Sequence, residues 1–223
     1  MVIFDCNGVL VDSEPLATAI VSQEFVRAGF PLTPDMIARY FTGRRPADMF
    51  ADVELATGRK LPDGFAAGVA DSILCRFRSE LCPTHHAAYA LSWLRGPKCV
   101  ASSSSIERIR VSLESTGLIR FFEPNLFSAS DVRNGKPAPD LLLHAAGKMG
   151  VEPGACIVVE DSPVGVTAGV AAGMTVIGFA GASHGSDTAD QFLAVGARDV
   201  ITELRALKRT IIDLAPGNAR FQL

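Results

Sequence analysis

The sequence has no long hydrophobic run and no strong excess of charge of either sign. Across the 223 residues, no stretch reaches the roughly 18 apolar residues that a transmembrane helix needs, so no membrane span is expected. The net charge of -3 gives no electrostatic basis for binding nucleic acid or an anionic membrane. The first apolar run is not preceded by a basic region, so a secretory signal is not expected either.

Paired cysteine motifs are also absent. The five cysteines form no C-x-x-C pair, and their number is odd. Several lie inside apolar runs, where a cysteine behaves as a small buried hydrophobic residue. Cys6 follows the carboxylate of Asp5, but alternation along a strand directs it away from that carboxylate, so we expect it to pack in the core. The cysteine pattern favours a reducing, cytoplasmic location.

Internal repeats, low-complexity tracts and long linkers are missing as well. The hydrophobic content of 48% and the charged content of 20% are typical of a globular protein with ample core material. The length permits one large domain, or one domain that carries an insertion.

Three short apolar runs each end in polar residues. Residues 1–4 precede Asp5, residues 98–101 precede four consecutive serines, and residues 156–159 precede two carboxylates. Short apolar runs between helical patterns are typical of buried parallel strands. Ligands of open α/β sheets bind beyond the C-terminal ends of such strands. The pattern therefore predicts that carboxylates and hydroxyls meet at one crevice, as a phosphoryl-transfer site requires.

The segment between the first two runs has a helical pattern throughout. Pro15, Pro34 and Pro46 are each placed to open a helix, and apolar residues recur on one face of a longer helix over residues 65–77. No strand pattern interrupts the segment. It predicts a small helical bundle inserted into an α/β domain.

Strands and helices alternate in the rest of the chain. Strands are predicted at residues 174–179 and 198–201, the second of them at a sheet edge, and a last helix at residues 203–214. Repeated β-α units imply a parallel, Rossmann-like sheet with right-handed crossovers. The predicted organisation is an α/β core formed by residues 1–13 and 83–223, with a helical cap at residues 14–82.

The chemistry of such a site follows from its residue types. A carboxylate such as Asp5 can attack phosphorus and form an acyl-phosphate, while Asp5, Asp161 and a backbone carbonyl are oxygen ligands of the kind that Mg²⁺ prefers. Ser102 and the N–H groups at the start of the following helix can hold phosphoryl oxygens. Lys136, in a loop directly before Pro137, is placed to bridge the nucleophile and the transferred group.

These segments resemble, in order, the motifs of the haloacid dehalogenase (HAD) superfamily, in particular its β-phosphoglucomutase-like phosphatase branch. Residues 2–14, VIFDCNGVLVDSE, are similar to the first motif except at position 7. Residues 100–103, 135–140 and 159–162 are similar to the second, third and fourth motifs, and residues 171–174 match the usual continuation. The resemblance covers nearly the whole chain and implies a Rossmann-like core with a helical cap inserted after the first motif.

The resemblance also implies roles for individual residues. Asp5 would be the nucleophile and a Mg²⁺ ligand, and Asn7 would offer its backbone carbonyl to the metal. Glu160 and Asp161 would anchor Mg²⁺ directly or through water.

The remaining implied roles concern the phosphoryl group. Ser102 and Ser103 would bind it, and Lys136 would stabilise it during transfer. In the cap, Arg44 and Arg45 lie near where the family contacts substrate, and an arginine pair can bind a second phosphate or a sugar-acid group bidentately. The alternative for this pair is a solvated loop.

Position 7 departs from the family pattern. The resembling phosphatases carry Asp there, which protonates the leaving alcohol and then activates water, whereas an Asn side chain cannot exchange a proton near neutral pH. Asn7 is compatible with an engineered substitution, with natural drift to low activity, or with different chemistry. Members that cleave C–halogen or C–P bonds also lack the second Asp. The C–P branch needs a cap lysine, however, and the only lysine of the predicted cap is Lys60, in a predicted exposed turn.

The expected function is that of a Mg²⁺-dependent phosphohydrolase, with activity impaired by Asn7. The expected substrates are small phosphorylated metabolites, sugar phosphates above all, and the expected state is a cytoplasmic monomer. The alternatives are a catalytically silent protein that retains phosphate and Mg²⁺ binding, and a hydrolase of C–X or C–P bonds.

Overall fold

Six parallel strands form a single sheet within the residues that the computed structural model describes, which are 1–41, 46–182 and 189–214. The strands lie in the order β3-β2-β1-β4-β5-β6. Their bounds are Val2–Phe4 (β1), Lys98–Ser102 (β2), Leu126–Ser128 (β3), Ile157–Glu160 (β4), Thr175–Phe179 (β5) and Asp199–Ile201 (β6).

Strand order reverses at β1, which lies between β2 and β4. Phe4 is in register with Val100 on one side and with Val159 on the other. Every residue of β1 is buried, which explains why its sequence is continuously apolar rather than alternating. The chain therefore leaves β1 at Asp5 in the place where a doubly wound sheet opens a crevice for ligands.

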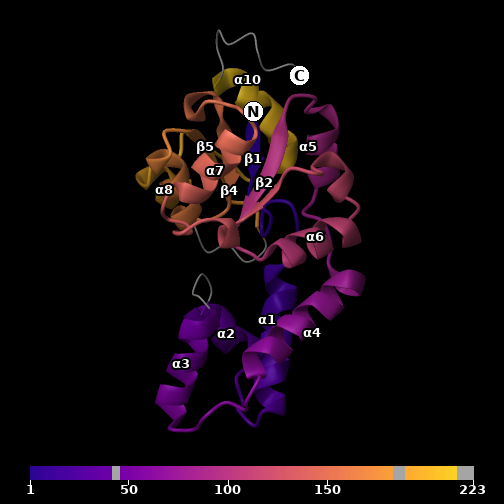
Figure 1. The fold of residues 1–223 in the computed structure, drawn as a ribbon, viewed down its shortest axis with the longest axis vertical. Helices are drawn as coiled ribbons and strands as arrows, with labels where there is room; N and C mark the ends of the chain where they lie inside the picture. Colours follow the sequence, from indigo (N-terminus) through magenta and orange to yellow (C-terminus); the bar gives the residue numbers. More distant parts are fainter. Residues whose placement is uncertain (42–45, 183–188, 215–223) are drawn as a thin grey trace.

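Helices cover both faces of the sheet (Figure 1). Val2 and Phe4 share one hydrophobic cluster with residues of α5, α6 and α10, and Ile3 shares a second cluster with residues of α7, α8 and α9. This division follows from the alternation of side chains along a strand. The bounds are Ala87–Trp93 (α5), Ile106–Ser115 (α6), Asp140–Lys148 (α7), Pro163–Ala171 (α8), Ala189–Ala194 (α9) and Leu207–Leu214 (α10).

A separate group of helices lies between β1 and β2 in the sequence and apart from the sheet in Figure 1. These helices are α1 (Glu14–Arg27), α2 (Pro34–Phe41), α3 (Pro46–Thr57) and α4 (Phe65–Glu80). Helix α1 packs against α2 and α4. Phe25 is buried at their centre, with ring centroids of Phe30, Phe50 and Phe65 at 6.3, 5.9 and 4.9 Å. The predicted helical insertion is confirmed.

The helical insertion joins the sheet through two connections that are hydrogen-bonded to each other. The Asp12 N–H donates to the Cys82 carbonyl at 3.0 Å, and the Thr84 N–H donates to the Leu10 carbonyl at 2.9 Å. Between these bonds, Val11 and Pro83 form an antiparallel bridge. The outgoing and returning chains therefore run side by side.

Several elements differ from the sequence prediction. Strand β3 and helix α5 were not predicted, because three residues are too few for a periodic pattern and α5 follows the cap without an obvious start signal. The last helix was predicted from residue 203, but a 3₁₀ turn at Leu204–Ala206 comes first and α10 begins at Leu207. Strand β6 lies at the sheet edge, as predicted. Among the described residues, no helix is long and apolar enough to cross a membrane.

Candidate active site

Asp5, Lys136 and Glu160 meet beyond the C-terminal ends of β1 and β4. The Lys136 Nζ donates to Asp5 Oδ1 at 2.7 Å and to the Ala101 carbonyl at 3.1 Å, and it also contacts Glu160 Oε1. The side chains are 5% exposed for Lys136, 10% for Asp5 and 1% for Glu160. A buried lysine thus joins the first and fourth predicted motifs through their carboxylates.

The pKa values of Lys136 and Glu160 are shifted because one ammonium group lies among several carboxylates. Burial by itself lowers the pKa of Lys136, but the Asp5 and Glu160 carboxylates outweigh it and raise that pKa above its usual value. Burial raises the pKa of Glu160; the Lys136 ammonium opposes this rise, and the negative charges of Asp5 and Asp161 add to it. The site therefore holds Lys136 charged and carries more negative charge than its lysine balances.

The Glu160 carboxylate occupies space that only a glycine leaves open. A Cβ built on Gly165 would lie 2.0 Å from Glu160 Oε2, far inside van der Waals contact. Ser162 caps α8 by accepting from the Gly165 N–H at 3.1 Å, and its hydroxyl donates to Glu160 Oε2 at 3.4 Å. The residue that starts α8 therefore also supports the carboxylate.

Asn7 is hydrogen-bonded at both ends of its amide. Its Nδ2 donates to Ser104 Oγ at 2.8 Å, and its Oδ1 accepts from Ser13 Oγ at 3.2 Å. Ser13 precedes α1, and its hydroxyl makes no capping bond to that helix. The side chain at position 7 therefore connects the serine loop after β2 with the start of the helical insertion.

The first of the four consecutive serines ends β2, and the other three form the turn before α6. Ser102 is buried, and its Oγ accepts from the Ser104 N–H at 3.3 Å. Ser103 is exposed, and Ser105 caps α6 by accepting from the Arg108 N–H at 3.3 Å. This arrangement places serine hydroxyls and the start of α6 next to Asn7, and a helix start of this kind can bind an anion.

A sequence comparison gives the family to which this site belongs. The haloacid dehalogenase-like hydrolase family matches residues 1–173 of the chain. The chain belongs to this family. The predicted membership of the HAD superfamily, the Rossmann-like fold with a helical insertion, and the assignment as a HAD-like hydrolase are confirmed.

The most similar relatives include phosphatases. A 6-phosphogluconate phosphatase from Escherichia coli (strain K12) is 34% identical over 184 residues, which are 82% of this chain and 83% of the relative. A haloacid dehalogenase-like protein of unknown function from Agrobacterium tumefaciens str. C58 has a solved structure with 35% identity and a TM-score of 0.83, covering 96% of this chain and 98% of that one.

A second solved structure from the family contains an anion. It is a HAD family hydrolase from Deinococcus radiodurans R1 with bound phosphate and sodium, at 30% identity and a TM-score of 0.80. The match covers 95% of this chain and 94% of that one.

The other predicted residues of the HAD site are distributed as follows. Asp161 is half-buried directly after β4 and interacts electrostatically with Glu160. Arg44 and Arg45 lie outside the described residues. Among the described residues, no three His, Cys, Asp or Glu side chains are grouped as a metal site. The Lys136 ammonium contacts two of the candidate carboxylates, those of Asp5 and Glu160.

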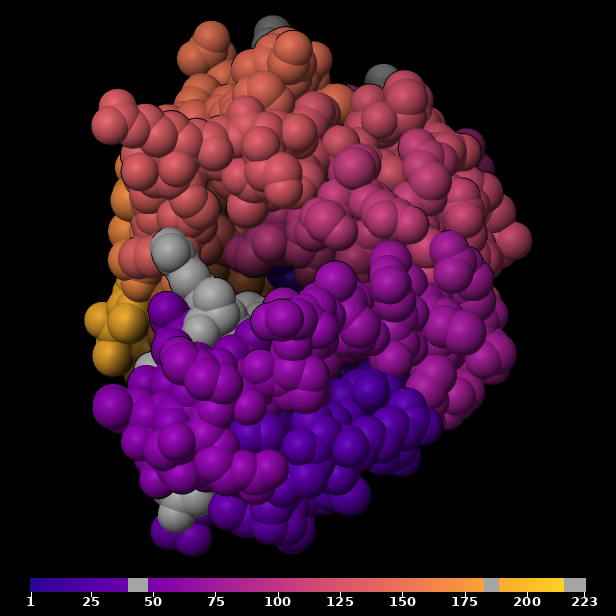
Figure 2. Space-filling view, turned by 60° about the horizontal axis from the view of Figure 1, so that its bottom comes forward, coloured from indigo at the N-terminus to yellow at the C-terminus, as the bar shows by residue number. Residues whose placement is uncertain are grey.

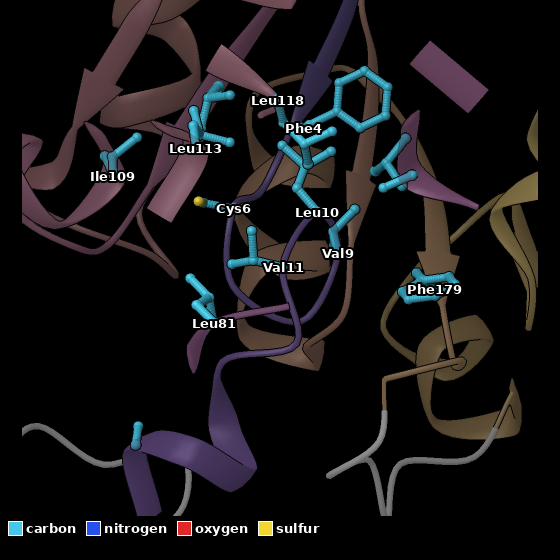
Figure 3. Packing of buried hydrophobic residues seen from close by; sticks show 14 of the residues in the cluster. Phe4, Cys6, Val9, Leu10, Val11, Leu81, Ile109, Leu113, Leu118 and Phe179 are labelled. Atoms are coloured by element: carbon cyan, nitrogen blue, oxygen red, sulfur yellow. The ribbon is translucent and has the colours of Figure 1, made fainter. Parts of the chain in front are cut away.

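Cys6 packs in the core, as predicted. Figure 3 shows it among apolar side chains that include Val11, Ile109 and Leu113. Burial raises the pKa of its thiol, and the neighbouring Asp5 carboxylate raises it further. A thiol of this kind is no nucleophile at neutral pH.

A hollow lies between the helical insertion and the rest of the molecule. In Figure 2 it lies between the violet helices and the pink and orange parts, with dark-blue N-terminal atoms visible at its floor. A further cavity of about 410 Å³ lies to the side, beyond the ends of β5 and β6. None of Asp5, Lys136 and Glu160 lines it, so we do not assign the chemistry to that cavity. Its lining residues are Asp12, Pro83, Thr84, His85, His86, Phe179, Gly181, Ala182, Thr202 and Glu203.

Sequence reasoning missed three residues that hold the HAD site together. Ser13 was not singled out, and Gly165 and Ser128 were not considered. A glycine three residues after a helix N-cap was a usable signal for Gly165, because a helix interior disfavours glycine unless a neighbour needs the space. Ser128 is the last residue of β3, and this three-residue strand is too short to leave a pattern in the sequence.

Proposed function

We propose that this chain is a phosphohydrolase that acts on small phosphorylated metabolites through an aspartyl-phosphate on Asp5. The observation that carries the proposal is the buried group of Asp5, Lys136 and Glu160 at the switch point of the sheet, next to the serine turn after β2. Phosphoryl transfer depends mainly on positioning and on charge neutralisation, and this group supplies both.

The proposed steps follow from the chain's own side chains. An Asp5 carboxylate oxygen attacks phosphorus, a P–O bond to Asp5 forms, and the P–O bond to the substrate breaks. The leaving alkoxide takes its proton from solvent water. Ser102, Ser103 and Lys136 bind the phosphoryl oxygens during this transfer. Water then attacks phosphorus, which releases phosphate and restores the Asp5 carboxylate. A lysine that stays charged through its carboxylate neighbours suits the binding of an anionic group.

Mg²⁺ is part of the proposal because the donor set fits it in ligand type and in charge. Asp5, Glu160 and Asp161 carry three carboxylates at the ends of adjacent strands, against the single ammonium of Lys136. We assign the metal to these carboxylates and to the Asn7 carbonyl, since Mg²⁺ prefers oxygen ligands. When bound, the metal would neutralise charge on the phosphoryl group.

Asn7 limits the proposed reaction. It keeps the shape and both hydrogen bonds of its position but has no proton to exchange near neutral pH. General acid–base catalysis contributes about 10²–10⁴-fold. We therefore propose a slow phosphatase in which the leaving alcohol receives no proton from residue 7.

The substrate class rests on the relatives and on the helical insertion. The 6-phosphogluconate phosphatase relative supports sugar phosphates and sugar-acid phosphates as substrates. Residues 14–82 are proposed as a cap domain that closes over the core formed by 1–13 and 83–223 and excludes water. Arg44 is proposed to contact the non-reacting part of the substrate. A monomeric, cytoplasmic enzyme completes the proposal.

A second candidate is a silent protein that binds phosphate esters and Mg²⁺ without turnover, and Asn7 favours it.

The structure gives less support to C–P cleavage. The Lys60 side chain is 88% exposed and its Nζ bonds Glu54 Oε2 at 2.6 Å, so it belongs to the surface turn that the sequence predicts.

A phosphate-release screen tests the proposal against this second candidate. The protein is assayed with Mg²⁺ and a panel of phosphorylated sugars, polyols and sugar acids, beside Asp5→Asn. Slow release that disappears in Asp5→Asn supports the phosphatase. Micromolar binding of a panel member without any release supports the silent protein, and absence of both binding and release contradicts both candidates.

A further inference from the structure

Ser128 is a fully buried polar residue at the C-terminal end of β3, and it lies next to the serine turn. It is 0% exposed and pairs in register with Ser102 of the neighbouring strand. Its hydroxyl donates to the Ser104 carbonyl at 2.7 Å and accepts from the Ser130 N–H at 3.1 Å. Both hydrogen-bonding functions of the hydroxyl are therefore used.

The backbone at Ser128 is fixed as well. Its N–H donates to Asp131 Oδ2 at 2.9 Å, and with the hydroxyl contacts this completes a capping box around the 3₁₀ turn Ala129–Asp131. A side chain held at both its backbone and its hydroxyl has little freedom to follow a moving neighbour. Ser128 is thus a rigid support for whatever it contacts.

The contact that it supports belongs to the active site. Ser104 uses its carbonyl for Ser128, its N–H for Ser102 Oγ and its Oγ for Asn7 Nδ2. Asn7 in turn accepts from Ser13 at the start of the helical insertion. One chain of hydrogen bonds therefore runs from β3 through the serine turn and residue 7 to the helical insertion.

We infer that Ser128 is a positioning residue for phosphate binding, which acts by holding the Ser104 carbonyl and with it the turn from Ser102 to Ser105. A peptide whose carbonyl is fixed on one side presents its neighbouring N–H groups in a fixed direction on the other. Loss of the Ser128 hydroxyl leaves that carbonyl unpaired, and the turn loses the orientation that serves an anion.

The test measures the affinity of the whole protein for inorganic phosphate by calorimetry, in the presence of Mg²⁺. Ser128→Ala is expected to weaken this affinity by about ten-fold, since an oriented turn is lost. Ser112→Ala is the matched control: Ser112 is equally buried in α6, but its hydroxyl has no hydrogen-bond partner. This control is expected to bind phosphate as the unsubstituted protein does.

Two further measurements separate positioning from general stability. Asp131→Ala removes an exposed side chain that holds the Ser128 N–H, and a smaller loss of phosphate affinity is expected with the fold retained. The side-chain amide signal of Asn7 in a ¹⁵N spectrum is expected to shift in Ser128→Ala and to stay in place in Ser112→Ala.

The outcomes distinguish this inference from the proposed function. Undiminished phosphate affinity in both Ser128→Ala and Asp131→Ala overturns the inference alone. An unshifted Asn7 amide signal in folded Ser128→Ala also overturns it, because the chain of hydrogen bonds would then carry nothing to residue 7. Absence of phosphate binding by the unsubstituted protein refutes the proposed function, and the inference with it.

Discussion

Replacement of Asn7 by aspartate is expected to raise the turnover of a good phosphate ester by about 10²–10⁴-fold. The change swaps one NH₂ group for oxygen and leaves the size of the side chain as it is. The gain would come from a carboxyl group that protonates the leaving alcohol and then takes a proton from the attacking water. It corresponds to a barrier lower by about 3 to 5 kcal/mol.

The hydrogen bonds of residue 7 explain why the substitution should change little else. The Ser13 hydroxyl already donates to Oδ1 at 3.2 Å and can do the same to a carboxylate. The Ser104 hydroxyl now accepts from Nδ2 at 2.8 Å, and it can rotate to donate instead. Because no hydrogen bond is lost, thermal stability should be nearly that of the original protein.

Single-turnover kinetics with two leaving groups test whether residue 7 protonates the leaving group. p-Nitrophenolate leaves without protonation, whereas a simple alcohol requires it, so Asn7→Asp should accelerate cleavage of the alkyl ester far more than that of p-nitrophenyl phosphate. Asn7→Ala, which loses both serine contacts, is the control for positioning. Asp5→Asn in the Asn7→Asp protein should abolish turnover. Equal acceleration of both esters, or no acceleration, would show that residue 7 is not the missing acid.

Two further predictions concern packing and thiol reactivity. Gly165→Ala is expected to lower the free energy of unfolding by about 1–3 kcal/mol, because its methyl group would overlap the Glu160 carboxylate; urea denaturation measures this, and the control Gly68→Ala, with open space around it in α4, should instead stabilise by about 0.5–1 kcal/mol. An unchanged midpoint for the first variant would contradict the close contact. Titration with an aromatic disulfide reagent should modify the exposed Cys75 and Cys82 rapidly in the native protein and all five thiols after unfolding, since burial raises the pKa of the others; fast reaction of a third native thiol would contradict the buried assignment.

The strand ends could be predicted because the sheet imposes its order on them. Continuous apolar runs marked β1, β2 and β4 as buried parallel strands, and the carboxyl ends of parallel strands meet at one edge. Asp5, Ser102 and Glu160 were therefore placed correctly at one edge without any knowledge of distances. Lys136 was found through its loop, although the sequence did not indicate that it would contact Glu160.

The supporting contacts could not be predicted, because each joins segments far apart in the chain. The Asn7–Ser104 bond spans 97 positions, and the Lys136–Asp5 bond spans 131. Local propensity and periodicity carry no information on which hydroxyl faces which amide across such separations. Ser13 and Ser128 look like ordinary polar residues in the sequence, and only their burial distinguishes them.

The paired connections at Asp12–Cys82 and Leu10–Thr84 have a consequence for exchange of parts between relatives. Since the helical segment departs and returns at two hydrogen-bonded points, its replacement need not move the sheet or the residues at the strand ends. A short turn of a few residues is enough to bridge two such adjacent antiparallel chains. The molecule is thus arranged so that a segment of different length or shape can be grafted between the same two points without displacing the strand ends.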